Sequence, residues 1–105
     1  MKKRFTKIIM WHGYKGRLRA GEYDNGRIAI RLVDIEDWAV LATCTVNLPD
    51  LAMKEDQVLI KDYSENEGMY HVLHSAGVIS QPIAYIQTGH VSVPLCELAV
   101  SLPLL

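Results

Sequence analysis

Several features that define whole protein classes are missing from this sequence. No run approaches the ~20 consecutive apolar residues that a membrane-spanning helix needs. The basic start Met1–Arg4 is followed by a segment that Lys7 interrupts and that lacks a small-residue cleavage site, so we expect no export signal. The cytoplasm is therefore the expected compartment, and no membrane partner is expected.

Cysteine is also scarce, with only Cys44 and Cys96 in the chain. Each lies in an apolar run, so each is expected to be a small buried hydrophobe whose thiol is unreactive. A disulfide between them would require their two strands to be neighbours.

Motifs of the common catalytic classes are missing too. The chain has no Gly-x-Ser-x-Gly elbow, no Cys-x-x-Cys pair and no glycine-rich phosphate loop. The sequence therefore predicts neither an enzyme nor a bound cofactor.

The composition is that of an ordinary globular protein, but the charges are unevenly distributed. Half of the 105 residues are hydrophobic and 22% are charged, which predicts one domain over residues 1–105 with one core. Residues 1–19 carry seven basic side chains and no acidic one, whereas residues 20–105 carry four basic and all 12 acidic side chains. Such asymmetry bears on association and not on the fold.

Alternation of side chains predicts strands in the first third of the chain. Residues 4–12 and 17–20 are expected to form a hairpin around the turn Gly13–Gly16. Asn25-Gly26 accepts positive φ at both positions, which predicts a two-residue type I′ turn. The strictly alternating strand Arg27–Leu32 follows, with its isoleucines and leucine on one face.

The rest of the chain contains further strands. Trp38–Val46 is a nearly continuous apolar run, which predicts a central strand covered on both faces. Pro49 ends it, and Pro94 indicates that the last strand lies at a sheet edge or carries a bulge. The apolar tail Ser101–Leu105 is expected either to pack on the core or to serve an interface.

One helix is predicted over residues 64–76. Ser64 followed by Glu67 has the spacing of a capping box, and Gly77 is expected to end the helix. Gly68 should weaken the first turn by up to ~1 kcal/mol relative to alanine. The spacing i, i+3, i+4, i+7 gives one apolar stripe, formed by Met69, Val72, Leu73 and Ala76.

These elements predict an α+β fold: an antiparallel sheet of about five to seven strands with one helix packed across a face. We expect the helix stripe to face Ile28, Ile30 and Leu32, or Val40 and Ala42 of the central strand. The edge near Pro94 and the tail would allow a homodimer.

Glu67, His71 and His74 lie on one face of the predicted helix. Two imidazoles and a carboxylate could hold a metal ion, which would suit a small metal-dependent hydrolase. The spacing is not that of a zincin helix and no fourth ligand is evident. An exposed helix face is the interpretation that we favour.

Acidic side chains gather just before and at the start of the same helix. A helix N-terminus lowers the pKa values of carboxylates instead of separating them, which argues against acid–base catalysis. Capping and solvation explain these residues, and the alternative is a recognition surface with a tyrosine anchor. This acidic surface consists of Asp62, Tyr63, Glu65 and Glu67.

The basic N-terminal hairpin is the second candidate surface. Lys15, Arg17 and Arg19 are interleaved with aromatic residues, a composition typical of nucleic-acid-binding faces. The acidic remainder of the chain would repel phosphate, so a solvated hairpin or a face for an acidic protein are the alternatives.

Parts of the sequence resemble a known family. The segments are Asn25–Leu32, Ala42–Pro49, Thr88–Val91 and Val93–Leu98, within residues 16–98. They are similar to a domain of unknown function in small bacterial proteins that is common on conjugative elements and prophages. The family begins with N-G-x-L-A-I-x-L, from which this chain departs only at Ile28, and Thr45–Pro49 is the most specific match. No established catalytic residues can be carried over.

The resemblance implies an accessory protein of a mobile element. Small non-catalytic proteins of such elements often block host defence systems, as anti-CRISPR proteins do, although this step is an analogy. The leading hypothesis is therefore a non-enzymatic module that binds and inhibits a host protein or nucleoprotein complex. A nucleic-acid-binding accessory protein that uses the basic hairpin is the alternative.

Overall fold

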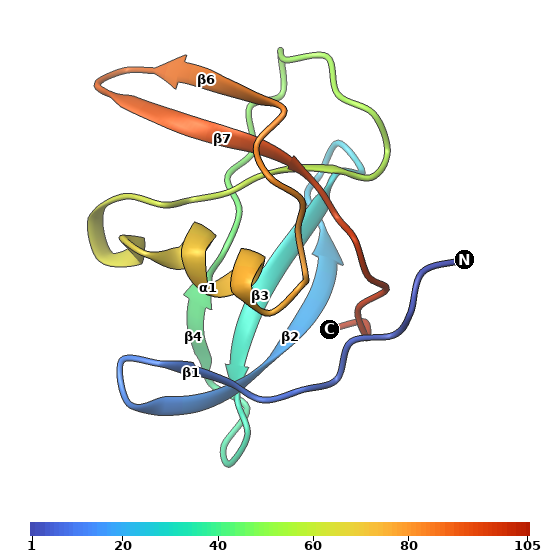
Figure 1. The fold of residues 1–105 in the computed structure, drawn as a ribbon, viewed down its shortest axis with the longest axis vertical. Helices are drawn as coiled ribbons and strands as arrows, with labels where there is room; N and C mark the ends of the chain where they lie inside the picture. The colour runs from blue at the N-terminus through green and yellow to red at the C-terminus, as the bar shows by residue number, and fades with distance from the viewer.

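Seven strands form two antiparallel sheets in the computed structural model, which describes residues 1–105 (Figure 1). The first sheet has the strand order β1-β2-β3-β4, and the second has the order β5-β7-β6. A short helix packs beside them, so the α+β class is as predicted. The strands are β1 (Ile9–Trp11), β2 (Tyr14–Glu22), β3 (Ile28–Asp34), β4 (Val40–Thr43), β5 (Gln57–Leu59), β6 (Ala84–Thr88) and β7 (Val91–Glu97), and the helical segments are η1 (Ser64–Asn66) and α1 (Met69–Ser75).

The prediction of a single sheet is corrected, because the chain forms two sheets. Backbone hydrogen bonds join the two sheets at one seam and join β2 to the C-terminal tail at a second. At the first, the Cys44 N–H donates to Ile30 of β3 while the Cys44 carbonyl accepts from Lys61, so the chain passes from one sheet to the other. At the second, the Ala20 N–H donates to Pro103, and the Leu105 N–H donates back to Ala20. Because the tail follows β7 in the chain, these two seams connect both sides of the first sheet to the second sheet. The alternation of side chains in the sequence does not reveal such connections.

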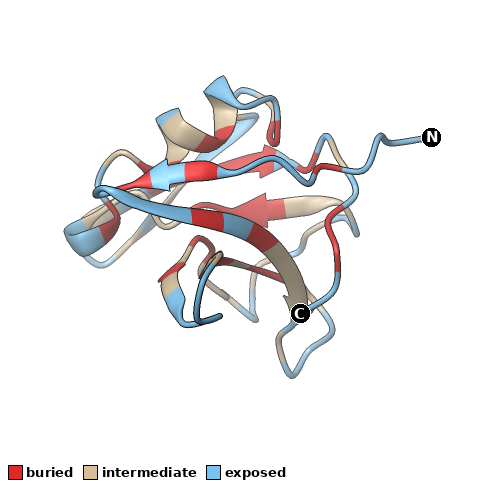
Figure 2. Cartoon of the chain, turned by 90° about the horizontal axis from the view of Figure 1, so that it is seen from below, coloured by how far each residue is buried: buried red, intermediate tan, exposed pale blue.

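The main core lies between the two sheets and against α1. It contains 17 buried residues (Figure 2). β1 and the middle of β2 alternate between buried and exposed positions, whereas β7 has four buried residues in a row. Met69 and Leu73 of α1 share this cluster with Ile30, Leu32 and Ala42, as the helix stripe predicted. Two predicted contacts are corrected, because Val40 is 53% exposed and Ala76 is exposed as well.

The type I′ turn predicted at Asn25-Gly26 is found instead in the hairpin between β1 and β2. The Asp24–Gly26 loop has three residues, since the Gly26 N–H donates to Tyr23 and the Tyr23 N–H donates to Arg27. Only Gly26 has positive φ there, which fits a type I turn with a bulge. The two-residue type I′ geometry occurs between β1 and β2, where His12 (φ 49°) and Gly13 (φ 83°) both have positive φ.

The predicted central strand Trp38–Val46 is wrong. β4 has four residues and is the edge of its sheet, while Trp38 lies in the preceding turn at φ 63°. The apolar run arises because β4 is followed by the seam residues, where Cys44 is fully buried. Composition indicated burial, but burial at a seam does not require a continuous strand.

The predicted helix over 64–76 is interrupted near its start, and the capping box does not form. Neither the Ser64 nor the Glu67 side chain makes a capping hydrogen bond, and Gly68 (φ 95°) separates η1 from α1. Instead, the Tyr70 N–H donates to Asp62 Oδ1 at 2.8 Å, so Asp62 caps α1 from outside the helix. This contact spans eight residues, beyond the spacing of any local capping motif.

The C-terminus of α1 ends as predicted. Gly77 has φ 77°, and its N–H donates to His74, while the Val78 N–H donates to Leu73. These are the two hydrogen bonds of a Schellman motif, and Leu73 and Val78 also meet in the core.

Pro94 corrects another prediction, because β7 is the middle strand of its sheet. The Pro94 carbonyl accepts from the Ile60 N–H at 3.0 Å, just beyond the end of β5. On its other side Pro94 lies opposite Tyr85 at a position where β7 does not hydrogen-bond to β6, since its backbone groups face β5. The missing N–H therefore removes no hydrogen bond to β6 and lies opposite Ile60, just past the end of the β5–β7 ladder.

The C-terminal tail is ordered and partly buried. Leu102 is 8% exposed and belongs to the main core, whereas Leu104 and Leu105 lie largely in solvent. Ser101 exchanges backbone hydrogen bonds with residues 3 and 5, which places the tail beside the N-terminal segment (Figure 1). Neither helical segment has the length needed to cross a membrane.

Candidate interaction surface

The basic residues of β2 share one face of the first sheet. Along β2, Gly16 and Leu18 are buried, whereas Lys15 and Arg17 are exposed and Arg19 is half-buried. Because side chains alternate along a strand, Lys15, Arg17 and Arg19 all project from the outer face, away from the core. The structure thus brings together all three residues predicted for the basic hairpin.

Arg31 of β3 extends this row of cations. It lies directly opposite Arg19 in the β2–β3 register and on the side of β3 that faces away from the buried Ile30 and Leu32. Like charges directly opposite each other on a sheet are unfavourable without a partner. Lys15, Arg17, Arg19 and Arg31 together are called the basic face below.

Trp38 stands at the rim of the basic face. Its indole lies 5.4 Å from the Arg19 guanidinium in a cation–π arrangement, and the residue is 65% exposed. Its backbone is held at φ 63°, a conformation that bulky residues rarely adopt and that costs about 1–3 kcal/mol. A small hollow beside it is bounded by Arg17, Arg19 and Val33.

The turn that carries Trp38 is built from acidic residues. Asp34 Oδ1 accepts from the Glu36 N–H at 2.7 Å, and Asp37 Oδ1 accepts from the Ala39 N–H at 3.0 Å. These carboxylates fix the turn between β3 and β4 and place negative charge beside the basic face. The surface is therefore of mixed sign.

The predicted acidic surface is largely occupied by contacts within the protein. Asp62 caps α1, and Tyr63 is half-buried against the second hydrophobic cluster, with its ring 5.6 Å from the Lys61 ammonium. Glu65 pairs with Lys61, and this hydrogen bond lowers the pKa of Glu65 and raises that of Lys61. Of the four predicted residues, only Glu67 is both exposed and free of a salt bridge.

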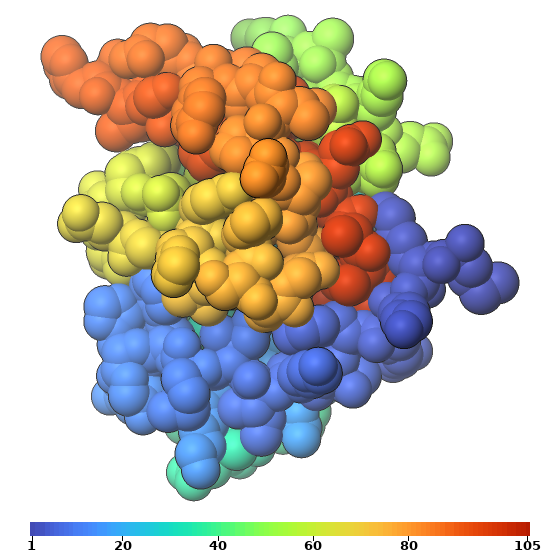
Figure 3. All heavy atoms as spheres, in the orientation of Figure 1, coloured from blue at the N-terminus to red at the C-terminus, as the bar shows by residue number.

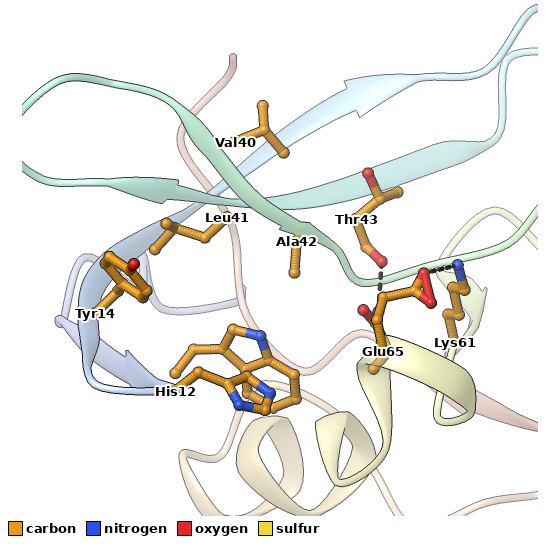
Figure 4. A pocket seen from close by; sticks show the side chains of 10 residues that line it. His12, Tyr14, Val40, Leu41, Ala42, Thr43, Lys61 and Glu65 are labelled. Atoms are coloured by element: carbon orange, nitrogen blue, oxygen red, sulfur yellow. Dashed lines mark hydrogen bonds and ion pairs between the residues drawn. The ribbon is translucent and has the colours of Figure 1, made fainter.

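A groove of about 650 Å³ lies between the β1–β2 hairpin, β4 and η1 (Figure 4). Its walls come from the β1–β2 turn, from β4 and from η1, and Asn66 of η1 donates to the Thr43 carbonyl at 2.7 Å. Glu65 of the acidic surface and Tyr14 of the hairpin both line it, together with Trp11, His12, Val40, Leu41, Ala42 and Lys61.

Glu67, His71 and His74 do not form a metal cluster. No three His, Cys, Asp or Glu side chains are grouped so that they could share a metal ion. The His74 ring instead stacks on Tyr70, with 5.3 Å between ring centroids.

Both cysteines are free and buried. Burial raises the pKa of the Cys44 thiol to about 12 and that of Cys96 to about 11, so both thiols are protonated at neutral pH. Neither supplies a nucleophile in this state.

Sequence analysis missed Arg31 and Trp38. Arg31 has the opposite parity to Ile30 and Leu32, so its side of the strand could be predicted, but its position opposite Arg19 depends on the strand register. Trp38 begins the apolar run that predicts a central strand covered on both faces, which hides its place in a turn. Its neighbours Asp34 and Asp37 were the available indication of a turn.

No protein-family model, curated protein or solved structure matches this chain.

Proposed function

We propose that the protein is a non-enzymatic binding module that presents the basic face and Trp38 to an acidic surface of a partner protein. One observation carries this proposal: four cationic side chains project from one face of the first sheet, with an exposed tryptophan in a strained backbone conformation beside them. Arginine and tryptophan are the residue types most often responsible for binding energy at protein interfaces.

The mixed charge of this surface favours a protein over nucleic acid. Asp34, Glu36 and Asp37 border the cations, and carboxylates there would repel a phosphate backbone. A protein surface can present acidic groups to the arginines and basic or polar groups to the turn. The resemblance described above gives the class of partner as a host protein or nucleoprotein complex of a defence system.

Affinity capture from host lysate tests the proposal. The tagged wild-type protein is expected to retain one complex, and a variant with Arg17→Ala, Arg19→Ala and Trp38→Ala is expected to lose it. A variant with Lys2→Ala, Lys3→Ala and Lys54→Ala removes the same number of side chains elsewhere and should retain the complex. Capture that survives the first variant and is lost with Glu65→Gln and Glu67→Gln would instead assign binding to the acidic surface.

A nucleic-acid-binding function is the second candidate, favoured by the alignment of cations along β2 and β3. Binding of DNA or RNA oligonucleotides should then weaken steeply with salt, and Arg17→Ala should reduce the slope of log K against log salt by about 1. Salt-independent or undetectable binding of oligonucleotides contradicts this candidate and leaves the protein partner.

A further inference from the structure

A large part of the surface carries no charged side chain. The segment from Gly68 to Cys96 contains no Asp, Glu, Lys or Arg, so all 23 such residues lie in the rest of the chain. This segment forms α1, β6 and all of β7 except Glu97. Its residues lie together on one face of the molecule, in yellow and orange in Figure 3.

β6 is a sheet edge within this uncharged region. It pairs only with β7. Because the backbone of Pro94 faces β5, the residues of β7 that bond to β6 are its neighbours Val93 and Leu95, which lie opposite Ile86 and Ala84. The backbone groups of Tyr85 and Gln87 therefore point out from the free edge.

Within Ala84–Thr88 this edge has no lysine and no proline that would hinder pairing with another strand. Proteins commonly place lysine, proline or a bulge on an edge strand, or cover it. β6 has the sequence Ala-Tyr-Ile-Gln-Thr, with Tyr85 66% exposed and the preceding Ile83 51% exposed. Nothing else in the chain pairs with it.

We propose that β6 pairs antiparallel with β6 of a second copy of this chain, which forms a symmetric dimer with one continuous six-stranded sheet. A two-fold axis at Ile86 places Tyr85 opposite Gln87 of the other copy. The outward N–H and C=O groups of Tyr85 then pair with those of Gln87, and the symmetry repeats this pair on the other side of the axis. A symmetric interface brings a patch against itself. An uncharged patch can meet itself without repulsion, whereas the basic face cannot.

The dimer would present two copies of the basic face to a partner, because that face belongs to the other sheet and stays outside the interface. Two linked faces raise the effective affinity for a partner with repeated sites. The dimer itself does not depend on the proposed function, so each can fail without the other.

Sedimentation velocity on the full chain over a range of concentrations tests the proposal. The wild-type protein should show the mass of a dimer, and Tyr85→Lys with Gln87→Lys should raise the dimer dissociation constant at least tenfold, because four added cations meet at the axis. Ile8→Lys adds a cation at an exposed apolar residue outside β6 and should leave the dimer intact.

Hydrogen exchange gives a second measurement on the unmodified chain. The amides of Tyr85 and Gln87 should be protected at concentrations where the dimer forms and should exchange rapidly on dilution. A wild-type protein that stays monomeric at all concentrations would overturn the proposal. A dimer that the lysine variants leave unchanged would do so as well.

Discussion

Gly68 shows how one backbone angle reverses an expectation based on helix propensity. In a helix interior, Gly68→Ala would stabilise the protein by up to ~1 kcal/mol. Gly68 instead lies before α1 at φ 95°, where an L-residue with a side chain is strained. We expect Gly68→Ala to lower the free energy of unfolding by about 1–2 kcal/mol in urea denaturation. No atom crowds the new methyl group, so a stabilised variant would contradict the assigned backbone.

Cys44 should make stability depend on alkaline pH. Burial raises its pKa from the ordinary 9.0 to about 12, so above pH 9 the thiol ionises in the unfolded chain but not in the folded one. The free energy of unfolding should therefore fall as pH rises from 9 towards 12, by up to about 1.4 kcal/mol per pH unit. Urea denaturation of wild type and Cys44→Ala checks this. An equally steep decline in the variant would assign the effect to other groups.

At the scale of elements, two variants distinguish the observed cap of α1, Asp62, from the cap predicted by the sequence, Ser64. Asp62→Ala removes the acceptor for the Tyr70 N–H, and we expect the free energy of unfolding to fall by about 0.5–2 kcal/mol. Ser64→Ala is the matched control, since the Ser64 side chain makes no capping bond, and should change it by less than about 0.5 kcal/mol. If Ser64→Ala destabilises the protein more than Asp62→Ala in thermal or urea denaturation, the helix would be capped by Ser64 and the assignment of Asp62 would be wrong.

Elements that depend on local chemistry could be predicted from the sequence. The strand predicted at Arg27–Leu32 and the stop at Gly77 both depend on signals within a few residues, and both appear in the structure, although β3 is buried on both sides and not on alternate residues. The cap of α1 and the end of the Trp38–Val46 run depend on contacts distant in sequence, with Asp62 and with Lys61 at the seam. Such contacts override local patterns, and one sequence does not contain them explicitly.

The residues of the candidate site also fall into those that local sequence predicts and those that depend on contacts distant in sequence. The common side of Arg17 and Arg19 follows from the two-residue period of the predicted strand 17–20. Lys15, which the sequence places in the turn Gly13–Gly16, joins them because β2 begins at Tyr14. Arg31 joins them through strand register, and Trp38 through a turn whose backbone angle no propensity favours. The acidic residues looked free in the sequence because their partners, Lys61 and the α1 backbone, are recognised only in three dimensions.

For the whole molecule, the tail should contribute strongly to stability. Leu102 is 8% exposed within the main core, so Leu102→Ala should lower the free energy of unfolding by about 2–5 kcal/mol. Leu105, which is 66% exposed, is the control, and Leu105→Ala should change it by no more than about 0.5 kcal/mol. Urea denaturation of both variants measures the difference. Equal effects would mean that the tail does not pack as described.

The second seam has a consequence for the kinetics of folding. It joins Ala20 to Pro103 and Leu105, positions near opposite ends of the chain. Bringing such distant segments together costs loop-closure entropy before the stabilising contacts form. Folding should therefore be slow for a protein of this size, on the order of milliseconds to seconds. We expect the pairing of the tail with β2 to be the last step of folding. A chain without the tail residues would then accumulate as an intermediate in which β2 lacks this partner.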